Sequence, residues 1–154
     1  AFRRVAQVVD ALPQSILFCC DHNAVRSPMA EAICKKFFGE EAYVQSAGIK
    51  NDLEIDGFAI AVCNEIGVEL SRHRTRSFEE MEKLGDQLSS FDLIVALTPS
   101  SFGRIEDLTR FYHIDLEFWR IDDPSGKGEG RDERLAAYRK ARDQIVAHLR
   151  KRWG

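Results

Sequence analysis

The chain has almost no excess charge of one sign and no long apolar run, and each absence excludes a class of function. Its 22 lysines and arginines stand against 25 aspartates and glutamates, which gives a formal net charge of −3. That balance makes no electrostatic case for nucleic-acid binding. No apolar run reaches the length needed to cross a membrane, and we expect no secretory signal. We therefore expect no nucleic-acid partner and no membrane.

Cysteine is also sparse, with four residues at positions 19, 20, 34 and 63. Their spacing matches neither a disulfide framework nor a pair of metal ligands. We therefore expect reduced thiols, a cytoplasmic location and no metal or cofactor. The sequence has no internal repeat, and 44% of its 154 residues are hydrophobic, which suits one domain with a substantial core.

The most informative stretch covers residues 15–31. Apolar residues typical of a buried strand lead to Cys20, and Arg26 follows with five residues between them. A Ser-Pro pair then begins a helix with one apolar face. We expect Ser27 to cap this helix with its hydroxyl and Pro28 to occupy its first position. The loop between Cys20 and Arg26 is therefore predicted to lie at a helix N-terminus.

Such a loop attracts anions, because free backbone N–H groups and the helix macrodipole point at it. It would stabilise a Cys20 thiolate as well as a bound phosphate. Arg26 can grip two oxygens of a tetrahedral anion, and Ser27 can donate its hydroxyl to the sulfur. Asn23 suits the left-handed backbone of a tight loop. The alternative, a buried cysteine, is the interpretation that we favour for Cys19, since strand neighbours point to opposite faces.

Hydrophobic patterning along the chain predicts alternating strands and helices, which indicates a parallel sheet covered by helices. The predicted strands are 15–19, 43–46, 93–97 and 117–121. The predicted helices are 28–38, 57–66, 78–88, 102–108 and 131–152, with Gly67 ending the second. An apolar stripe within residues 1–14 predicts a helical extension before the main domain, which we place at 15–154.

The loop resembles the signature of the low-molecular-weight protein tyrosine phosphatase family, and the likeness extends from about residue 15 to about residue 149. The matching positions are Cys20, Asn23, Arg26, Ser27, Pro28, Met29, Ala30, Glu31, Ser46, Ala47, Gly48, Asp92 to Leu97, Asp123 and Pro124. The resemblance implies an α/β three-layer sandwich of flavodoxin-like phosphatase fold. Its four-stranded parallel sheet would have the order 2-1-3-4, with ligand bound beside the first strand.

The resemblance also implies hydrolysis of phosphomonoesters, above all protein phosphotyrosine, through a phosphocysteine intermediate. Cys20 would attack phosphorus, Arg26 would hold the phosphoryl oxygens, and Ser27 would assist departure of the thiolate. Asp123 would act as general acid and then base, with Asp122 in reserve. The loop positions that would bind phosphate are Asp21, His22, Asn23, Ala24, Val25 and Arg26. Expected partners are a phosphorylated protein or small aryl phosphate, and inorganic phosphate.

Four further positions bear on the site. His73 and Ser46 are predicted to brace the loop from behind, as their counterparts in the family do. His22 lies inside the loop where the family usually has glycine, and we favour a side chain that points to solvent over one that contacts phosphate. A basic run is predicted to form a solvated face that could meet an acidic phosphoprotein; it consists of Arg72, Arg74 and Arg76.

Two departures from the family leave alternatives open. Val25 replaces a second cysteine that family members usually carry, and the segments around the site lack the aromatic residues of tyrosine-specific members. Arsenate reductases share the fold, and residues 119–127 resemble theirs, but residues 98–108 contain no cysteine for the relay that those enzymes need. The second alternative is a weakly active module that binds phosphoproteins.

Overall fold

The computed structural model describes residues 11–39 and 41–154. Four strands form one sheet in the order β2-β1-β3-β4, and all neighbouring strands are parallel. Their bounds are β1 Ser15–Cys20, β2 Tyr43–Gly48, β3 Leu93–Ala96 and β4 Asp115–Phe118. The predicted fold class and strand order are thus confirmed. Most of the predicted helical extension over residues 1–14 lies outside the described residues.

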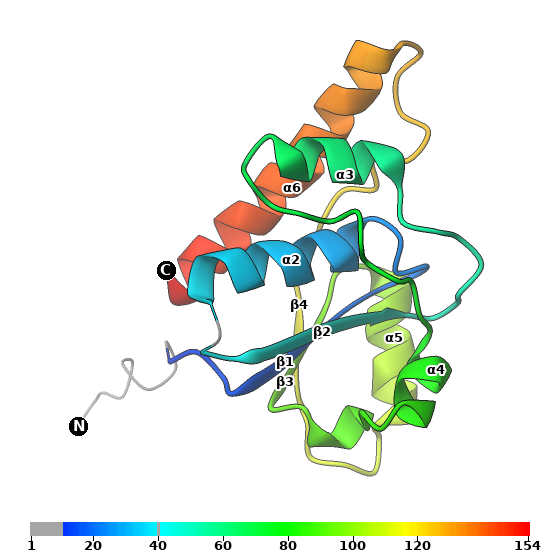
Figure 1. Cartoon of the computed structure of the whole chain (residues 1–154). Helices are drawn as coiled ribbons and strands as arrows, with labels where there is room; N and C mark the ends of the chain where they lie inside the picture. Colours follow the sequence, from blue (N-terminus) through cyan, green and yellow to red (C-terminus); the bar gives the residue numbers. More distant parts are fainter. Residues whose placement is uncertain (1–10, 40) are drawn as a thin grey trace.

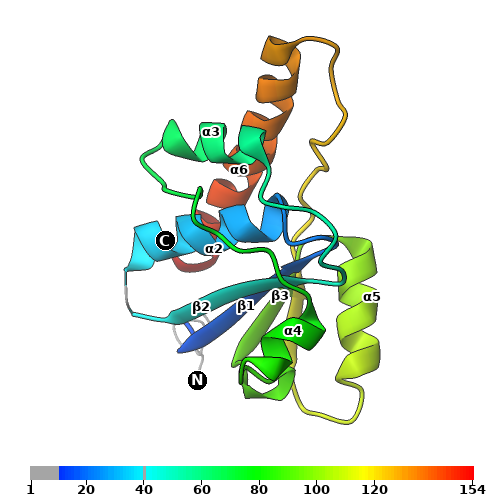
Figure 2. The same cartoon turned by 45° about the vertical axis from the view of Figure 1, so that its right-hand side comes forward.

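Helices cover both faces of the sheet, which makes three layers (Figures 1 and 2). On one face lie α2 (Arg26–Phe38), α3 (Gly57–Asn64) and α6 (Arg131–Trp153). On the other lie α4 (Phe78–Lys83), a 3-10 turn over Leu88–Ser90 and α5 (Pro99–Leu108). Within the described residues, no helix is both long enough and apolar enough to cross a membrane.

The alternation of side chains along β1 divides the core in two. Ile16 and Phe18 are fully buried beneath α2 and α6, whereas Leu17 and Cys19 are fully buried on the opposite face. Cys19 packs there in the cluster that contains Met81 and Ile105. The prediction that Cys19 faces the core is confirmed. Cys20, the last residue of the strand, emerges at the carboxyl edge of the sheet.

The strand β4 and the helix α5 differ from the predicted ranges. The strand begins at residue 115 and ends at 118 rather than covering 117–121, because pairing with the short β3 fixes its register. The helix begins at Pro99, three residues before the predicted start. Thr98 caps it by accepting the Ser101 N–H, and Ser101 reciprocates at the Thr98 N–H, a capping box without the usual acidic partner.

The beginning of α2 corrects the prediction that Ser27 caps this helix. The helix begins at Arg26, Val25 occupies the cap position, and no side chain caps it. The Ser27 hydroxyl is instead engaged by Cys20 and Asn23. The Arg26 N–H at the start of the helix therefore remains available to an anion, while the Ser27 N–H donates to the Cys20 sulfur.

Candidate active site

The predicted phosphate loop joins the carboxyl end of β1 to the start of α2. Because β1 lies between β2 and β3, the loop emerges where the strand order reverses, the usual ligand position in such sheets. The backbone N–H groups of residues 21–25 donate to no other described residue, whereas the carbonyls of Asp21, Ala24 and Val25 all accept hydrogen bonds. The loop is thus fixed through its acceptors and leaves its donors free, as an anion cradle requires.

Cys20 ends β1 at the start of this loop and is 3% exposed. Its Sγ is 2.9 Å from the Ser27 Oγ, and the Ser27 N–H donates to it at 3.4 Å. The Asn23 Nδ2 donates to the same Ser27 oxygen at 2.8 Å. Since that oxygen already accepts from Asn23, its own proton is free to point at the sulfur.

Asn23 holds the loop together from a fully buried position. Its backbone has φ +55°, the one positive value outside glycine among the described residues, and asparagine tolerates this conformation better than most residues. The Nδ2 group donates to Ser46 as well as Ser27, while Oδ1 accepts from His73 Nε2 at 2.9 Å and from the Arg76 N–H at 3.0 Å. All four hydrogen-bonding positions of the amide are therefore used.

Ser46 and His73, predicted to brace the loop, both contact Asn23. The Ser46 hydroxyl donates a hydrogen bond to Glu31 Oε1 at 2.6 Å. Because Asn23 presents its oxygen, His73 must donate from Nε2. Burial lowers the pKa of His73 despite the nearby charge of Glu31, which favours the neutral ring that carries its proton on this nitrogen.

Two supports of the loop escaped the sequence analysis. Arg76, predicted to lie on a solvated face, has a side chain only 16% exposed, and its guanidinium donates to the Ser46 carbonyl and to Gln45. Gly48 ends β2 against the loop, where a Cβ atom would lie 2.7 Å from the Asn23 nitrogen. Nothing in the basic run distinguished Arg76 from its exposed neighbours. The glycine at position 48, just after a predicted strand, was a signal that another backbone segment could approach closely there.

Arg26 extends from α2 toward the loop that follows β4. Its Nη1 donates to the Ile121 carbonyl at 3.3 Å, and its Nη2 lies 4.0 Å from Asp123 Oδ2. Asp123 borders the same cavity as Cys20. Asp122 instead pairs with Lys140 at 3.2 Å, a hydrogen bond that holds the pKa of Asp122 below its usual value. Of the two adjacent carboxylates, only Asp123 borders the cavity.

The cavity has a volume of about 320 Å³. Its lining consists of Cys20, Asp21, His22, Ala24, Val25, Arg26, Leu53, Glu54, Asp56, Asp123 and Ser125. Asp21 is anchored across the sheet edge by the hydroxyls of Thr98 and Ser100. Five of the six predicted phosphate-loop residues thus border the cavity, and the sixth, Asn23, is buried.

His22 does not point freely to solvent as predicted. Its Nδ1 lies 2.6 Å from Asp52 Oδ1, and this hydrogen bond lowers the pKa of Asp52. The pair ties the phosphate loop to the β2–α3 connection, which carries Leu53 and Glu54 to the cavity wall. Nothing in the sequence marked Asp52 as the partner, because the two residues are thirty positions apart.

The other three cysteines are fully buried. Burial raises the pKa of Cys19 well above its usual value, that of Cys34 to about 12 and that of Cys63 to about 11. These thiols are thereby kept protonated and unreactive. The described residues contain no group of three histidine, cysteine, aspartate or glutamate side chains arranged to hold a metal ion.

A parallel sheet of order 2-1-3-4 with a cysteine loop at its switch point defines the class of flavodoxin-like phosphatase folds. The chain belongs to the family described as low molecular weight phosphotyrosine protein phosphatase, which it matches over residues 15–152. It therefore has the fold of a family of phosphatase-type enzymes.

Individual relatives include both phosphatases and arsenate reductases. The chain is 33% identical over 146 residues to an arsenate reductase of Halalkalibacterium halodurans, a match covering 88% of this chain and 91% of that protein. It resembles a low molecular weight protein tyrosine phosphatase from T. tengcongensis with a TM-score of 0.72, 25% identity and coverage of 90% and 96%. Vibrio vulnificus Wzb in complex with benzylphosphonate gives 0.67 at 20% identity, covering 90% and 98%.

Proposed function

We propose that the protein hydrolyses phosphomonoesters in two steps through a phosphocysteine, with protein phosphotyrosine as its physiological substrate class. The observation that carries this proposal is the set of N–H groups at residues 21–25 that donate to no other described residue, in a loop that borders the same cavity as Cys20 and Arg26. A phosphoryl group seated there would present phosphorus to the sulfur, with its oxygens toward fixed donors. The relative bound to benzylphosphonate supports a phosphoryl ligand in this fold.

In the first step, the Cys20 thiolate attacks phosphorus, the S–P bond forms, and the P–O bond to the leaving group breaks. Asp123 gives its proton to the departing oxygen. In the second step, Asp123 takes a proton from water as that water attacks phosphorus, and the S–P bond breaks to release phosphate. The Ser27 hydroxyl, held by Asn23, donates to the sulfur that regains its negative charge.

Arg26 would bind two phosphoryl oxygens with its fork. Its contact with the Ile121 carbonyl orients the guanidinium, and its nearness to Asp123 Oδ2 couples the phosphate site to the acid loop. This chemistry needs a reduced thiol, so we expect the protein to act in a reducing compartment such as the cytoplasm.

The leaving group would face the wall formed by Leu53 and the His22–Asp52 pair. Leu53 is 51% exposed, and no aromatic side chain lines the cavity. An aryl ring can pack on Leu53, which supports an aryl phosphate or phosphotyrosine as substrate. The shallow apolar contact predicts a weaker preference for tyrosine than an aromatic wall would give.

Arsenate reduction is the second candidate, favoured by the names of the curated relatives. The loop would bind a tetrahedral dianion through its shape and charge, and arsenate is also a tetrahedral dianion. A thioredoxin-coupled reductase must also pass oxidation from one cysteine to another. Here Val25 occupies the loop position next to Arg26, and the other three cysteines are fully buried with protonated thiols.

One preparation tests both candidates. We expect multiple turnover of a chromogenic aryl phosphate, competitive inhibition by arsenate and vanadate, and trapping of a phosphorylated Cys20 by rapid acid quench. Sustained arsenite formation with thioredoxin and its reductase, lost in Cys34→Ser or Cys63→Ser, would instead establish a rewired relay. Phosphate binding without turnover or a phosphocysteine would identify a phosphoprotein-binding module.

A further inference from the structure

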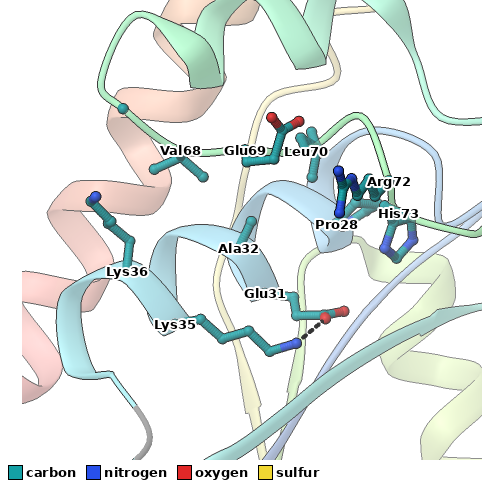
Figure 3. A pocket seen from close by; sticks show the side chains of 11 residues that line it. Pro28, Glu31, Ala32, Lys35, Lys36, Val68, Glu69, Leu70, Arg72 and His73 are labelled. Atoms are coloured by element: carbon teal, nitrogen blue, oxygen red, sulfur yellow. Dashed lines mark hydrogen bonds and ion pairs between the residues drawn. The ribbon is translucent and has the colours of Figure 1, made fainter.

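A second cavity lies beside α2, away from the Cys20 loop, and nothing in the proposed reaction uses it. Its volume is about 460 Å³, and it separates α2 from the segment that connects α3 with α4 (Figure 3). Its lining consists of Pro28, Glu31, Ala32, Lys35, Lys36, Gly67, Val68, Glu69, Leu70, Arg72 and His73. Arg72 belongs to the same basic run of the sequence as Arg76. The side chain of Arg76 is mostly buried and supports the loop.

The acidic side chains at this cavity already have partners. Glu31 accepts from Lys35 at 2.6 Å and from Ser46. Glu69 is bonded to the hydroxyl and the backbone N–H of Ser71, which hold the pKa of Glu69 below its usual value. Its carboxylate points away from Lys35 and Lys36 in Figure 3. Glu31 thus has a cationic partner, whereas Glu69 is bonded only to neutral groups of Ser71 and keeps its negative charge.

Two of the basic side chains form no close ion pair. Lys36 and Arg72 are both exposed, and neither forms a hydrogen bond or ion pair with another described residue, although the charge of Arg72 helps to lower the pKa of Glu69. Figure 3 shows them at opposite ends of the cavity. Val68 and Leu70 lie between them and contribute to an apolar floor, being only 3% and 2% exposed.

The length of the cavity along α2 limits the shape of a ligand. Pro28 and Lys36, the first and last residues of α2 that line the cavity, are eight residues apart, which corresponds to about 12 Å along the helix. An extended peptide covers that length in about three to four residues. Two acidic side chains at this spacing would reach Lys36 and Arg72, while an apolar side chain between them would contact the floor.

We propose that this cavity docks an extended acidic segment of the phosphoprotein on which the enzyme acts, an inference that rests on the proposed function. Charge complementarity identifies the occupant, since the chain as a whole carries a net charge of −3 and yet three cations, Lys35, Lys36 and Arg72, line this cavity against two carboxylates, Glu31 and Glu69. His73 borders the cavity and contacts Asn23, so the docked segment lies behind the phosphate loop and not on its reacting atoms. The docking therefore lowers KM and leaves kcat unchanged.

A direct binding experiment tests the site without requiring catalysis. The probe is a dye-labelled, unphosphorylated peptide with two glutamates three residues apart and a leucine between them, measured by fluorescence anisotropy. Lys36→Gln combined with Arg72→Gln is expected to weaken its binding by about threefold to thirtyfold, as two exposed ion pairs imply. Raising the salt concentration should weaken binding to the unaltered protein.

The matched control is Arg104→Gln combined with Lys151→Gln, which removes two exposed cations elsewhere that likewise lack ion-pair partners among the described residues. This control should bind the probe as the unaltered protein does. Equal weakening in both double variants, no binding up to millimolar peptide, or displacement of the peptide by inorganic phosphate would each overturn the proposal.

Catalytic assays separate this inference from the proposed function. Turnover of a small aryl phosphate should be the same in the Lys36/Arg72 double variant and the unaltered protein, while KM for a phosphotyrosyl peptide bearing the acidic segment rises and its kcat does not. A change in kcat, or an unchanged KM for the acidic substrate, would contradict docking of substrate. If the unaltered protein does not hydrolyse the aryl phosphate, that result counts against the proposed function and not against docking of the acidic peptide.

Discussion

Replacing Ser27 with alanine tests the central contact of the site, the hydroxyl that lies 2.9 Å from the Cys20 sulfur. The Asn23 amide occupies the Ser27 oxygen as an acceptor, so the hydroxyl proton is directed to sulfur. A hydrogen bond to a charged group contributes about 1.5–3 kcal/mol. At about 1.4 kcal/mol per factor of ten, losing it should reduce the thiolate-dependent rate by about 10-fold to 150-fold.

Two measurements follow this change. Iodoacetate should alkylate Cys20 more slowly in the Ser27→Ala variant, because the sulfur loses the hydrogen bond that the Ser27 hydroxyl donates. Rapid mixing with an aryl phosphate that has a good leaving group should then reveal a burst of phenol. The burst is expected because thiolate departure in the second step loses the same hydrogen bond and becomes rate-limiting.

The matched control is Ser100→Ala, which removes an exposed hydroxyl that binds Asp21 at the edge of the loop and does not contact sulfur. It should be alkylated at the rate of the unaltered protein. The reasoning is refuted if Ser27→Ala is alkylated as fast as the control and shows no burst. Thermal unfolding of both variants establishes that each is folded.

The remaining predictions use the same assays. Cys20→Ser should abolish turnover, whereas Cys19→Ser should retain it and lower the unfolding temperature, because Cys19 is fully buried in the core; the opposite result would mean that the nucleophile is misassigned. Asp123→Asn should slow poor leaving groups by about 10²-fold to 10⁴-fold and good ones far less, while Asp122→Asn, which breaks a pair with Lys140, should change neither rate much. The lowered pKa of His73 means that the unfolded chain binds its proton more readily, so stability against urea should fall as the pH drops below about 6.5, and this slope should become shallower in His73→Gln.

Local patterns predicted the parallel sheet, because the central strands β1 and β3 read as buried apolar runs. The strand order came from the resemblance to the phosphatase family. The helix starts were harder to predict. Ser27 has the residue type and the following proline of a cap, yet Cys20 and Asn23 compete for its hydroxyl. A cap at Thr98, completed by a serine and not by an acid, lies outside the usual pattern. Tertiary contacts and atypical partners decided both cases.

Candidate site residues could be gathered from the sequence where they lie in one loop, and not where they meet across the fold. Cys20 and Arg26 are six positions apart, and a strand and a helix hold them together. Arg76 and Asp52 come to the loop from distant segments, and each belongs to a residue type that usually lies at the surface. Sequence spacing gave no signal of either contact.

The phosphate loop is held in place through its carbonyl acceptors, while its N–H donors at residues 21–25 have no partner among the described residues. Its carbonyls bind Lys50, Asp56 and the first turn of α2, and the Asn23 amide has no unused position. Rearranging the loop to satisfy its own N–H groups would break these bonds and leave buried polar atoms unpaired, each at a cost of about 1–3 kcal/mol. The N–H groups of residues 21–25 therefore stay without an acceptor among the described residues, in a loop that borders the same cavity as Cys20. A tetrahedral anion that binds this loop would meet donors already in place, and the protein would not need to reorganise as charge develops at phosphorus.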